Sequence, residues 1–204
     1  MMNYQLPIVN SQFTILLGVL LFLLGIAHMS PRLALLDARI FRFMHKSLRR
    51  ANSVFQVIWH LGRTPLTLVC LVIFLLFDLQ IGIMVAIILA AAAIVEWSIK
   101  RTFKRPRPYI LIPDAIMAQP RKPKDASFPS GDAMRIWFLA LTIPFVFGLS
   151  PVFIVGSSII ALIVTLGRIA MGVHFPLDTL AGTGLGLIAS GVSIYLISSI
   201  AWVS

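Results

Sequence analysis

Charged residues are scarce in this sequence, and their scarcity excludes an ordinary soluble domain. Only 12% of the 204 residues are Asp, Glu, Lys or Arg, whereas 59% are hydrophobic, and the mean hydropathy is +0.96. A soluble domain carries about 25% charged residues. The sequence therefore predicts an integral membrane protein, organised as a single domain over residues 1–204.

Cysteine and acidic residues are also few. The single cysteine, Cys70, lies in an apolar run, which excludes a disulfide framework and a cysteine-based metal site. Seven acidic residues against 17 basic ones leave a net charge of +10. Because the basic residues are confined to the polar segments between apolar runs, they favour a phosphorylated or anionic lipid and the bilayer as partners, rather than nucleic acid.

Six apolar segments follow one another, and each is predicted to be a membrane-spanning helix, since lipid offers backbone groups no partners. The first two are shorter than the roughly 20 residues that cross hydrocarbon, so we expect them to extend into their flanks. The first run has no basic residue before it and no clear cleavage site after it, so it is interpreted as a retained span. The segments cover residues 13–29, 64–77, 79–99, 133–149, 152–171 and 180–202.

The segment between the first two spans, residues 31–63, has helical periodicity. Its apolar residues recur every three or four positions, and its basic residues take the other face. The pattern predicts an amphipathic helix at the membrane surface, within an all-α bundle of six transmembrane helices. The apolar positions are Leu33, Leu36, Ile40, Met44 and Leu48, and the basic ones are Arg39, Arg42, Lys46, Arg49 and Arg50.

Three polar clusters are predicted to meet at one membrane face. They lie at the end of the third span, the start of the fourth and the junction of the fifth and sixth, and counting the crossings puts all three on the same side. Taken singly, each has an ordinary explanation: a basic helix end, a helix cap and an interfacial histidine. Together they supply guanidinium groups that can bind a phosphate and an imidazole with a carboxylate to fix its tautomer. The clusters are residues 96–108, 127–132 and 168–178.

These segments resemble the signature of the type 2 phosphatidic acid phosphatase superfamily, in its membrane lipid phosphatase branch. The family pattern is Lys-x6-Arg-Pro, then Pro-Ser-Gly-His, then Ser-Arg-x5-His-x3-Asp. The first is matched completely from Lys100 to Pro108, the second is matched except at Asp132, and the third has Gly167 in place of serine. Three spaced motifs in order are far more specific than any one of them.

The resemblance implies a role for each matched residue. The residues that bind the phosphoryl oxygens would be Lys100, Arg107, Arg168, Ser130 and Gly131. His174 would be the nucleophile that forms a phosphohistidine, and Asp178 would orient it. Fixed cations supply the electrostatics, so neither a metal nor a cofactor is expected. The implied activity is hydrolysis of a phosphomonoester or diphosphate on a lipid, such as a polyprenyl diphosphate or a phosphatidate-like or lipid A-like substrate.

Asp132 replaces the histidine that is the family's usual acid for the leaving group. A carboxylate among cations is ionised at neutral pH and has no proton to donate. Three interpretations follow: the leaving group needs little protonation, as with a diphosphate; His45 or His60 supplies the proton; or Asp132 only begins a helix in a protein of altered activity.

Other functions and both orientations stay open. A lipid phosphotransferase would use the same pocket, and a non-catalytic lipid-binding or transport protein is the alternative outside the enzymes. We expect a multi-pass protein, in the inner membrane if it is bacterial. By the predicted spans, every Lys and Arg lies on the side of the site, and the only charged residue on the opposite side is Asp78, so the positive-inside rule favours a cytoplasmic site. Bacterial members of the family, in contrast, usually have their site facing the periplasm.

Overall fold

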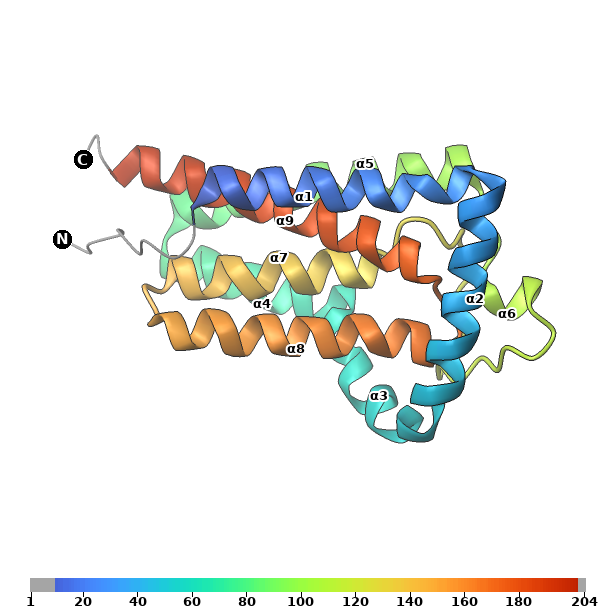
Figure 1. The fold of residues 1–204 in the computed structure, drawn as a ribbon. Coiled ribbons are helices and arrows are strands. Elements are labelled where there is room, and N and C mark those ends of the chain that lie inside the picture. The colour runs from blue at the N-terminus through green and yellow to red at the C-terminus, as the bar shows by residue number, and fades with distance from the viewer. Residues whose placement is uncertain (1–9, 202–204) are drawn as a thin grey trace.

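The computed structural model describes residues 10–201, and in this part of the chain all of the regular structure is helical. The expectation of an all-α fold is confirmed. Figure 1 shows the longer helices lying side by side along one axis, with the start of α1 and the end of α9 at the same end of the bundle. These helices are α1 (Ser11–Ile26), α4 (Thr64–Phe77), α5 (Leu79–Phe103), α7 (Gly131–Val146), α8 (Pro151–Ala170) and α9 (Pro176–Ala201).

Several helices are long and apolar enough to cross a membrane, so the chain is an integral membrane protein. Within the described residues four segments qualify, and a fifth is counted if the bent pair Pro31–Gly62 and Thr64–Phe77 is taken as one span. The remaining helix, α7, has 16 residues and falls short of the roughly 20 that cross hydrocarbon. The four are Ser11–Met29, Leu79–Leu111, Pro151–Ala170 and Pro176–Ile200.

Helix α9 lies at the centre of the bundle, with α1 packed along it (Figure 1). Small residues bring the two backbones together: a Cβ at Gly18 would lie 2.7 Å from the carbonyl oxygen of Gly184. A Cβ at Gly25 would lie 2.5 Å from the Cβ of Ala181. Close backbone approach through small residues is a common way for membrane helices to associate.

Helix α2 (Pro31–Leu48) crosses the end of the bundle (Figure 1). Its buried residues are Asp37, Phe41 and His45, which lie beside the predicted apolar stripe. Within the stripe, Leu33, Leu36 and Ile40 are exposed, whereas Met44 and Leu48 are partly buried and pack against core residues. Short helical segments then lead back to α4: η2 (Arg49–Ala51), α3 (Asn52–Ile58) and η3 (Trp59–Gly62).

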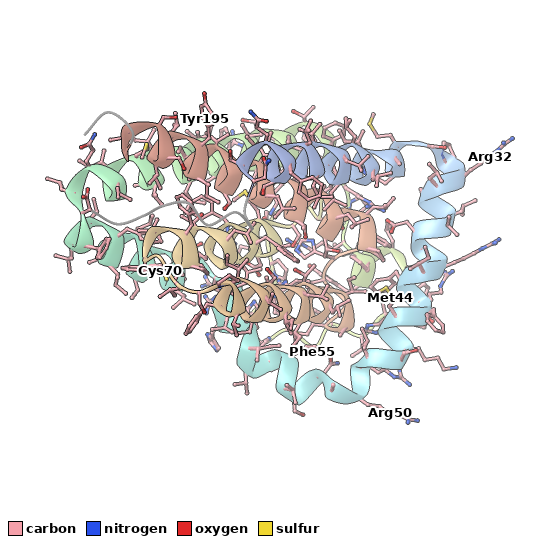
Figure 2. The ribbon with its side chains drawn as sticks, turned by 60° about the vertical axis from the view of Figure 1, so that its left-hand side comes forward. Arg32, Met44, Arg50, Phe55, Cys70 and Tyr195 are labelled. Atoms are coloured by element: carbon pink, nitrogen blue, oxygen red, sulfur yellow. The ribbon has the colours of Figure 1, made fainter. Side chains whose placement is uncertain are left out.

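The basic residues around α2 point away from the bundle. Figure 2 shows the side chains of Arg32 and Arg50 extending outward near the two ends of this segment. Both residues are exposed. The outward basic face agrees with the sequence pattern, whereas the choice of Asp37, Phe41 and His45 as the inner face was not predicted.

Candidate active site

A polar cavity of about 570 Å³ lies where α5 ends, α7 begins and α8 ends. Six of the eight predicted site residues line it: Lys100, Arg107, Gly131, Asp132, Arg168 and His174. The other lining residues come mainly from the segment before α4 and from the loop between α6 (Pro108–Leu111) and α7. They are Trp59, Arg63, Thr64, Pro65, Gln119, Arg121, Lys122, Pro123, Lys124, Asp125 and Arg135.

The end of α5 turns two arginines into the protein. Lys104 caps the helix in a left-handed conformation, with φ +45°. Arg105 and Arg107 follow, and both are buried, although Lys104 and Pro106 are exposed. The cluster is therefore not a uniformly exposed basic helix end, which was the ordinary explanation for Arg105.

The imidazole of His174 has one nitrogen at the cavity and one towards Asp178. Nη1 of Arg107 lies 3.1 Å from Nε2 of His174 and also donates to the carbonyl oxygen of Val173 at 2.9 Å. A guanidinium only donates, so Nε2 is the acceptor and the ring proton sits on Nδ1. Nδ1 lies 3.8 Å from Oδ2 of Asp178. The tautomer therefore puts the Nε2 lone pair on the cavity side of the ring, where it accepts from Arg107.

Asp178 lies behind the histidine, fully buried and held from several sides. It accepts hydrogen bonds from Ser127 Oγ at 2.5 Å and from the backbone N–H of Phe175 at 2.8 Å. Its other oxygen accepts from Nη1 of Arg105 at 2.5 Å. Nη2 of Arg105 donates in turn to Asp37 on α2, at 2.7 Å.

Lys100 and Arg107 share one carboxylate partner from the loop. Asp125 accepts a hydrogen bond from Lys100 and, at 2.8 Å, one from Nη2 of Arg107. Lys100 also pairs with Glu96 one turn earlier, at 2.7 Å. The Asp125 carboxylate thus occupies the place between two predicted phosphate-binding cations where an anion would be bound.

Arg168 is buried with unused donors. Nη2 lies 2.9 Å from Oδ2 of Asp132 and also donates to Gln119 Oε1. Within residues 10–201, Nε and Nη1 have no hydrogen-bond partner, and the side chain is only 3% exposed. An unpaired buried donor costs about 1–3 kcal/mol, so this side chain is poised to bind an acceptor entering the cavity.

The first turn of α7 carries the second cluster. Ser130 is its N-cap, accepting from the backbone N–H of Ala133 at 3.5 Å. Its backbone N–H donates to the carbonyl oxygen of Asp178 at 3.0 Å, which joins the second cluster to the third. A Cβ at Gly131 would lie 2.7 Å from Oε1 of Glu96, so a glycine is needed for this close packing.

Two predicted site residues do not line the cavity. Ser130 is fully buried, and Asp178 lies behind His174, which does line the cavity.

His45 and His60, the two candidates for a general acid in place of the family histidine, also lie outside the cavity. His45 uses both ring nitrogens on backbone groups, Ala170 O at 2.9 Å and Ile116 N–H at 3.1 Å. His60 is exposed and outside the lining.

Five functional candidates were missed from the sequence, namely Asp37, Arg105, Gln119, Asp125 and Ser127. Arg105 was explained as part of an exposed basic helix end. Asp125 and Gln119 lie in the polar loop before α7, where no motif singles them out. One feature of the sequence could have identified Asp37 as a buried residue. It is the one acidic residue in α2, four positions before the buried Phe41, and a carboxylate on the inner face of a helix needs a cationic partner.

Gly167, which departs from the family serine, has a local explanation. A Cβ at this position would lie 2.8 Å from Cδ1 of Phe55 in α3. Phe55 is 7% exposed and packs with Trp59, Ala170, Met171 and Val173. The aromatic ring therefore fills the space that a serine side chain would need.

Burial and charge shift the pKa of two groups in the loops of the site. Burial, with the positive charge of Arg107, lowers the pKa of His174 to about 3, so the imidazole is neutral at physiological pH. Burial alone would raise the pKa of Asp125, but Lys100 and Arg107 hold it well below its usual range. At neutral pH the site therefore contains a neutral imidazole and an ionised loop carboxylate.

Comparison with known families gives a match over most of the C-terminal part of the chain. The model of the PAP2 superfamily matches residues 80–202. An undecaprenyl-diphosphatase of Sulfolobus acidocaldarius is 32% identical over 121 residues, which are 59% of this chain. The match spans 57% of the length of that relative.

Two solved structures share the fold. The transmembrane PAP2-type phosphatidylglycerolphosphate phosphatase of Bacillus subtilis superposes with a TM-score of 0.74 at 22% identity, over 92% of this chain and 96% of that one. LpxE of Aquifex aeolicus superposes with a TM-score of 0.67 at 25% identity, over 77% of this chain and 93% of that one. The first match extends well beyond residues 80–202 and so includes the N-terminal helices.

Proposed function

Because the chain belongs to the PAP2 superfamily, we propose that it is a membrane-embedded lipid phosphatase that acts on a phosphomonoester or diphosphate of a lipid. One observation supports this most directly. Arg168 has two buried nitrogens, Nε and Nη1, with no hydrogen-bond partner among the described residues, in a cavity that also holds the accepting Nε2 of His174. An anion-binding group beside a nucleophile is what phosphoryl transfer requires.

The first chemical step is attack by Nε2 of His174 on phosphorus. Lys100, Arg107 and Arg168 hold the phosphoryl oxygens, and the bond to the leaving oxygen breaks as the N–P bond forms. Asp178 stabilises the imidazolium through Nδ1–H, while Ser127 and Arg105 fix the carboxylate. Water then attacks the phosphohistidine, releases phosphate and restores the neutral imidazole.

The substrate phosphate replaces Asp125 in this mechanism. In the structure the Asp125 carboxylate lies on Lys100 and Arg107. A phosphoryl group carries more charge than a carboxylate and has three oxygens with which to satisfy both cations. Arg107 releases Nε2 as it turns to the phosphoryl group. No metal is needed in this scheme, so we expect activity to survive EDTA.

The membrane arrangement that we propose has six crossing helices with α2 at the interface. Helices α4 and α7 are short, so either the hydrocarbon layer of the bilayer is thinner around them or the crossing segments include their flanking turns. The cavity then faces one side of the membrane, and the start of α1 and the end of α9 face the other. Figure 1 shows the end of α5 and the start of α7 at the opposite end of the bundle from these two helix ends. A reporter fused after Ser204 distinguishes a cytoplasmic from an extracytoplasmic active site.

A phosphotransferase remains the second candidate, because the phosphohistidine is the same and only the acceptor differs. Release of inorganic phosphate in detergent, without an added lipid acceptor, favours the hydrolase. Formation of a phosphorylated lipid when an acceptor lipid is added, without release of inorganic phosphate in its absence, favours the transferase.

The test of the proposed function is phosphate release from phosphatidate, phosphatidylglycerophosphate, polyprenyl diphosphate and lipid A by purified protein. His174→Ala should abolish release, with a loss of about 10⁴-fold or more for removal of a nucleophile. His60→Ala is the matched control, because His60 is exposed outside the cavity, and it should retain activity. Release that survives His174→Ala would remove the proposed nucleophile, and failure to release phosphate from any lipid would favour a non-catalytic binding or transport protein.

A further inference from the structure

Asp132 joins two guanidinium groups that face the polar cavity. Its Oδ1 accepts from Nη2 of Arg135 at 2.5 Å, and its Oδ2 lies 2.9 Å from Nη2 of Arg168. Nε of Arg135 is anchored on the carbonyl oxygen of Gly62, at 3.0 Å. Arg135 is thus a fixed cation of the cavity, one carboxylate away from the proposed phosphate-binding arginine, and the proposed function gives it no role.

The cavity carries more positive charge than one phosphate needs. Its lining contains eight Lys and Arg side chains and two carboxylates. Three of these cations are assigned to the transferred phosphoryl group. The other five are Arg63, Arg121, Lys122, Lys124 and Arg135, and among them Arg135 is the one with both a backbone anchor and an ion pair.

The same carboxylate determines which leaving groups the site can release. Held between two guanidinium groups, Asp132 is ionised and has no proton to donate. An alkoxide, the leaving group of a phosphomonoester, is strongly basic and needs a proton as it departs. A phosphate leaving group does not, because its conjugate acid has a second pKa of about 6. The two histidines that were candidates for an alternative acid lie outside the cavity.

We infer that Arg135 binds the phosphoryl group that stays on the lipid, so that the preferred substrate is a lipid diphosphate. The inference rests on the proposed function and adds to it a second phosphoryl subsite. Arg168 and Arg135, bridged by Asp132, then face adjacent phosphoryl groups. Asp132 holds Arg135 in place instead of donating a proton.

The reaction balances without an acid. The lone pair of Nε2 forms the N–P bond to the terminal phosphorus, and the P–O bond to the bridging oxygen breaks. Both electrons remain on that oxygen, so a lipid monophosphate departs as an anion, against Arg135. Water then supplies an oxygen to phosphorus, orthophosphate leaves, and the second proton of the water is released to solvent.

The decisive experiment compares a polyprenyl diphosphate and a polyprenyl monophosphate of the same chain length. The unaltered protein should have the higher kcat/KM on the diphosphate by about 100-fold or more, since general acid catalysis contributes about 10²–10⁴-fold. Arg135→Gln should lower kcat/KM on the diphosphate by about 10- to 100-fold, the effect of losing one charged hydrogen bond, and change the monophosphate rate less than about 2-fold. Arg135→Lys should recover part of the loss, and Arg42→Gln, an exposed arginine of α2, should change neither rate.

Inhibition of the unaltered protein provides a test that no folding defect can obscure. Inorganic pyrophosphate should compete at least about 10-fold more tightly than orthophosphate, because only pyrophosphate spans both subsites. Equal inhibition constants, equal rates on the two lipids, or an Arg135→Gln variant that loses both rates in proportion would overturn the inference while leaving the phosphatase proposal standing. Absence of phosphate release from every lipid would instead defeat the proposed function itself.

Discussion

Arg105 donates from Nη1 to Oδ1 of Asp178 at 2.5 Å, and from Nη2 to Oδ2 of Asp37 at 2.7 Å. One buried guanidinium therefore connects α2 to the carboxylate behind the proposed nucleophile. Since Asp178 fixes His174 through Nδ1, Arg105 acts on the reacting atoms through two other residues. It is a positioning residue at one of the unspecified positions of the first motif.

Replacing Arg105 should damage both stability and turnover. Arg105→Gln leaves Asp37 and Asp178 buried without a cation, and breaking a buried pair costs about 3–5 kcal/mol. Thermal unfolding in detergent measures this loss. In the fraction that stays folded, kcat should fall while KM changes little, because the substrate contacts remain.

Arg105→Lys should recover part of the turnover, because a lysine preserves the charge but reaches only one carboxylate at a time. Arg101→Gln is the control. Arg101 lies four positions before Arg105 and is exposed, with its guanidinium 3.9 Å from the centroid of the Trp97 ring. An unchanged kcat in folded Arg105→Gln would contradict the positioning role.

Removing the carboxylate that lies on the phosphate-binding cations should tighten anion binding. Asp125→Asn frees Lys100 and Arg107 of a competing charge, so inhibition by orthophosphate or vanadate should strengthen by about 10-fold, the effect of one charged hydrogen bond. Asp114→Asn in the same loop is the control, because Asp114 makes only a 3.9 Å pair with Arg42. Weaker inhibition in Asp125→Asn would show that the carboxylate organises the cations instead of competing for them.

The activity of the free enzyme should not decline with the ordinary pKa of histidine. Burial and Arg107 lower the pKa of His174 to about 3, so the imidazole remains neutral as the pH falls from 7 towards 4. The acidic limb of kcat/KM assigned to this group should therefore lie near pH 3, below the usual 6.5.

Arg107→Gln should move that limb to higher pH, because the positive charge that disfavours the imidazolium is gone. The measurement is kcat/KM between pH 4 and 8 for the unaltered protein and the variant. A limb at 6.5 in the unaltered protein, insensitive to Arg107→Gln, would contradict the assignment.

Restoring the family serine should destabilise this chain. Gly167→Ser places a Cβ 2.8 Å from the ring of Phe55, and overpacking a filled site costs about 1–3 kcal/mol. Chemical denaturation of Gly167→Ser, Phe55→Leu and the double variant measures the coupling. A double variant whose loss equals the sum of the single losses would show that the two residues do not compete for space.

The helical fold and six of the residues that line the cavity were predictable from the sequence. Apolar runs of sufficient length determine membrane helices, because lipid leaves the backbone no alternative. Lys100, Arg107 and Arg168 line the same cavity as His174, as counting the crossings required. The roles of these residues in catalysis stay predictions.

The contacts that hold the site residues in place could not be predicted from the sequence. They depend on where side chains point and on the path of the loop, and the spacing of apolar residues determines neither. Arg105 points inward only because Lys104 adopts a left-handed conformation at the end of α5. In α2 the apolar positions predicted a helix at the membrane surface, but they did not identify Asp37, Phe41 and His45 as the residues that face the protein, since a helix at a membrane boundary contacts both lipid and protein. Asp125 and Gln119 belong to a loop whose path is fixed by distant contacts, such as Ala118 N–H to Met171 O at 3.0 Å.

The contact between α2 and Asp178 has a consequence for how small this catalytic unit can be made. The family match begins at residue 80, whereas Asp37 comes from well before it. A shortened chain starting at the match would retain every motif residue, yet it would leave Arg105 with half of its partners and uncover the side of Asp178 that α2 now shields. For this chain, we therefore expect the minimal functional fragment to include α2, even though none of the motifs lies in it.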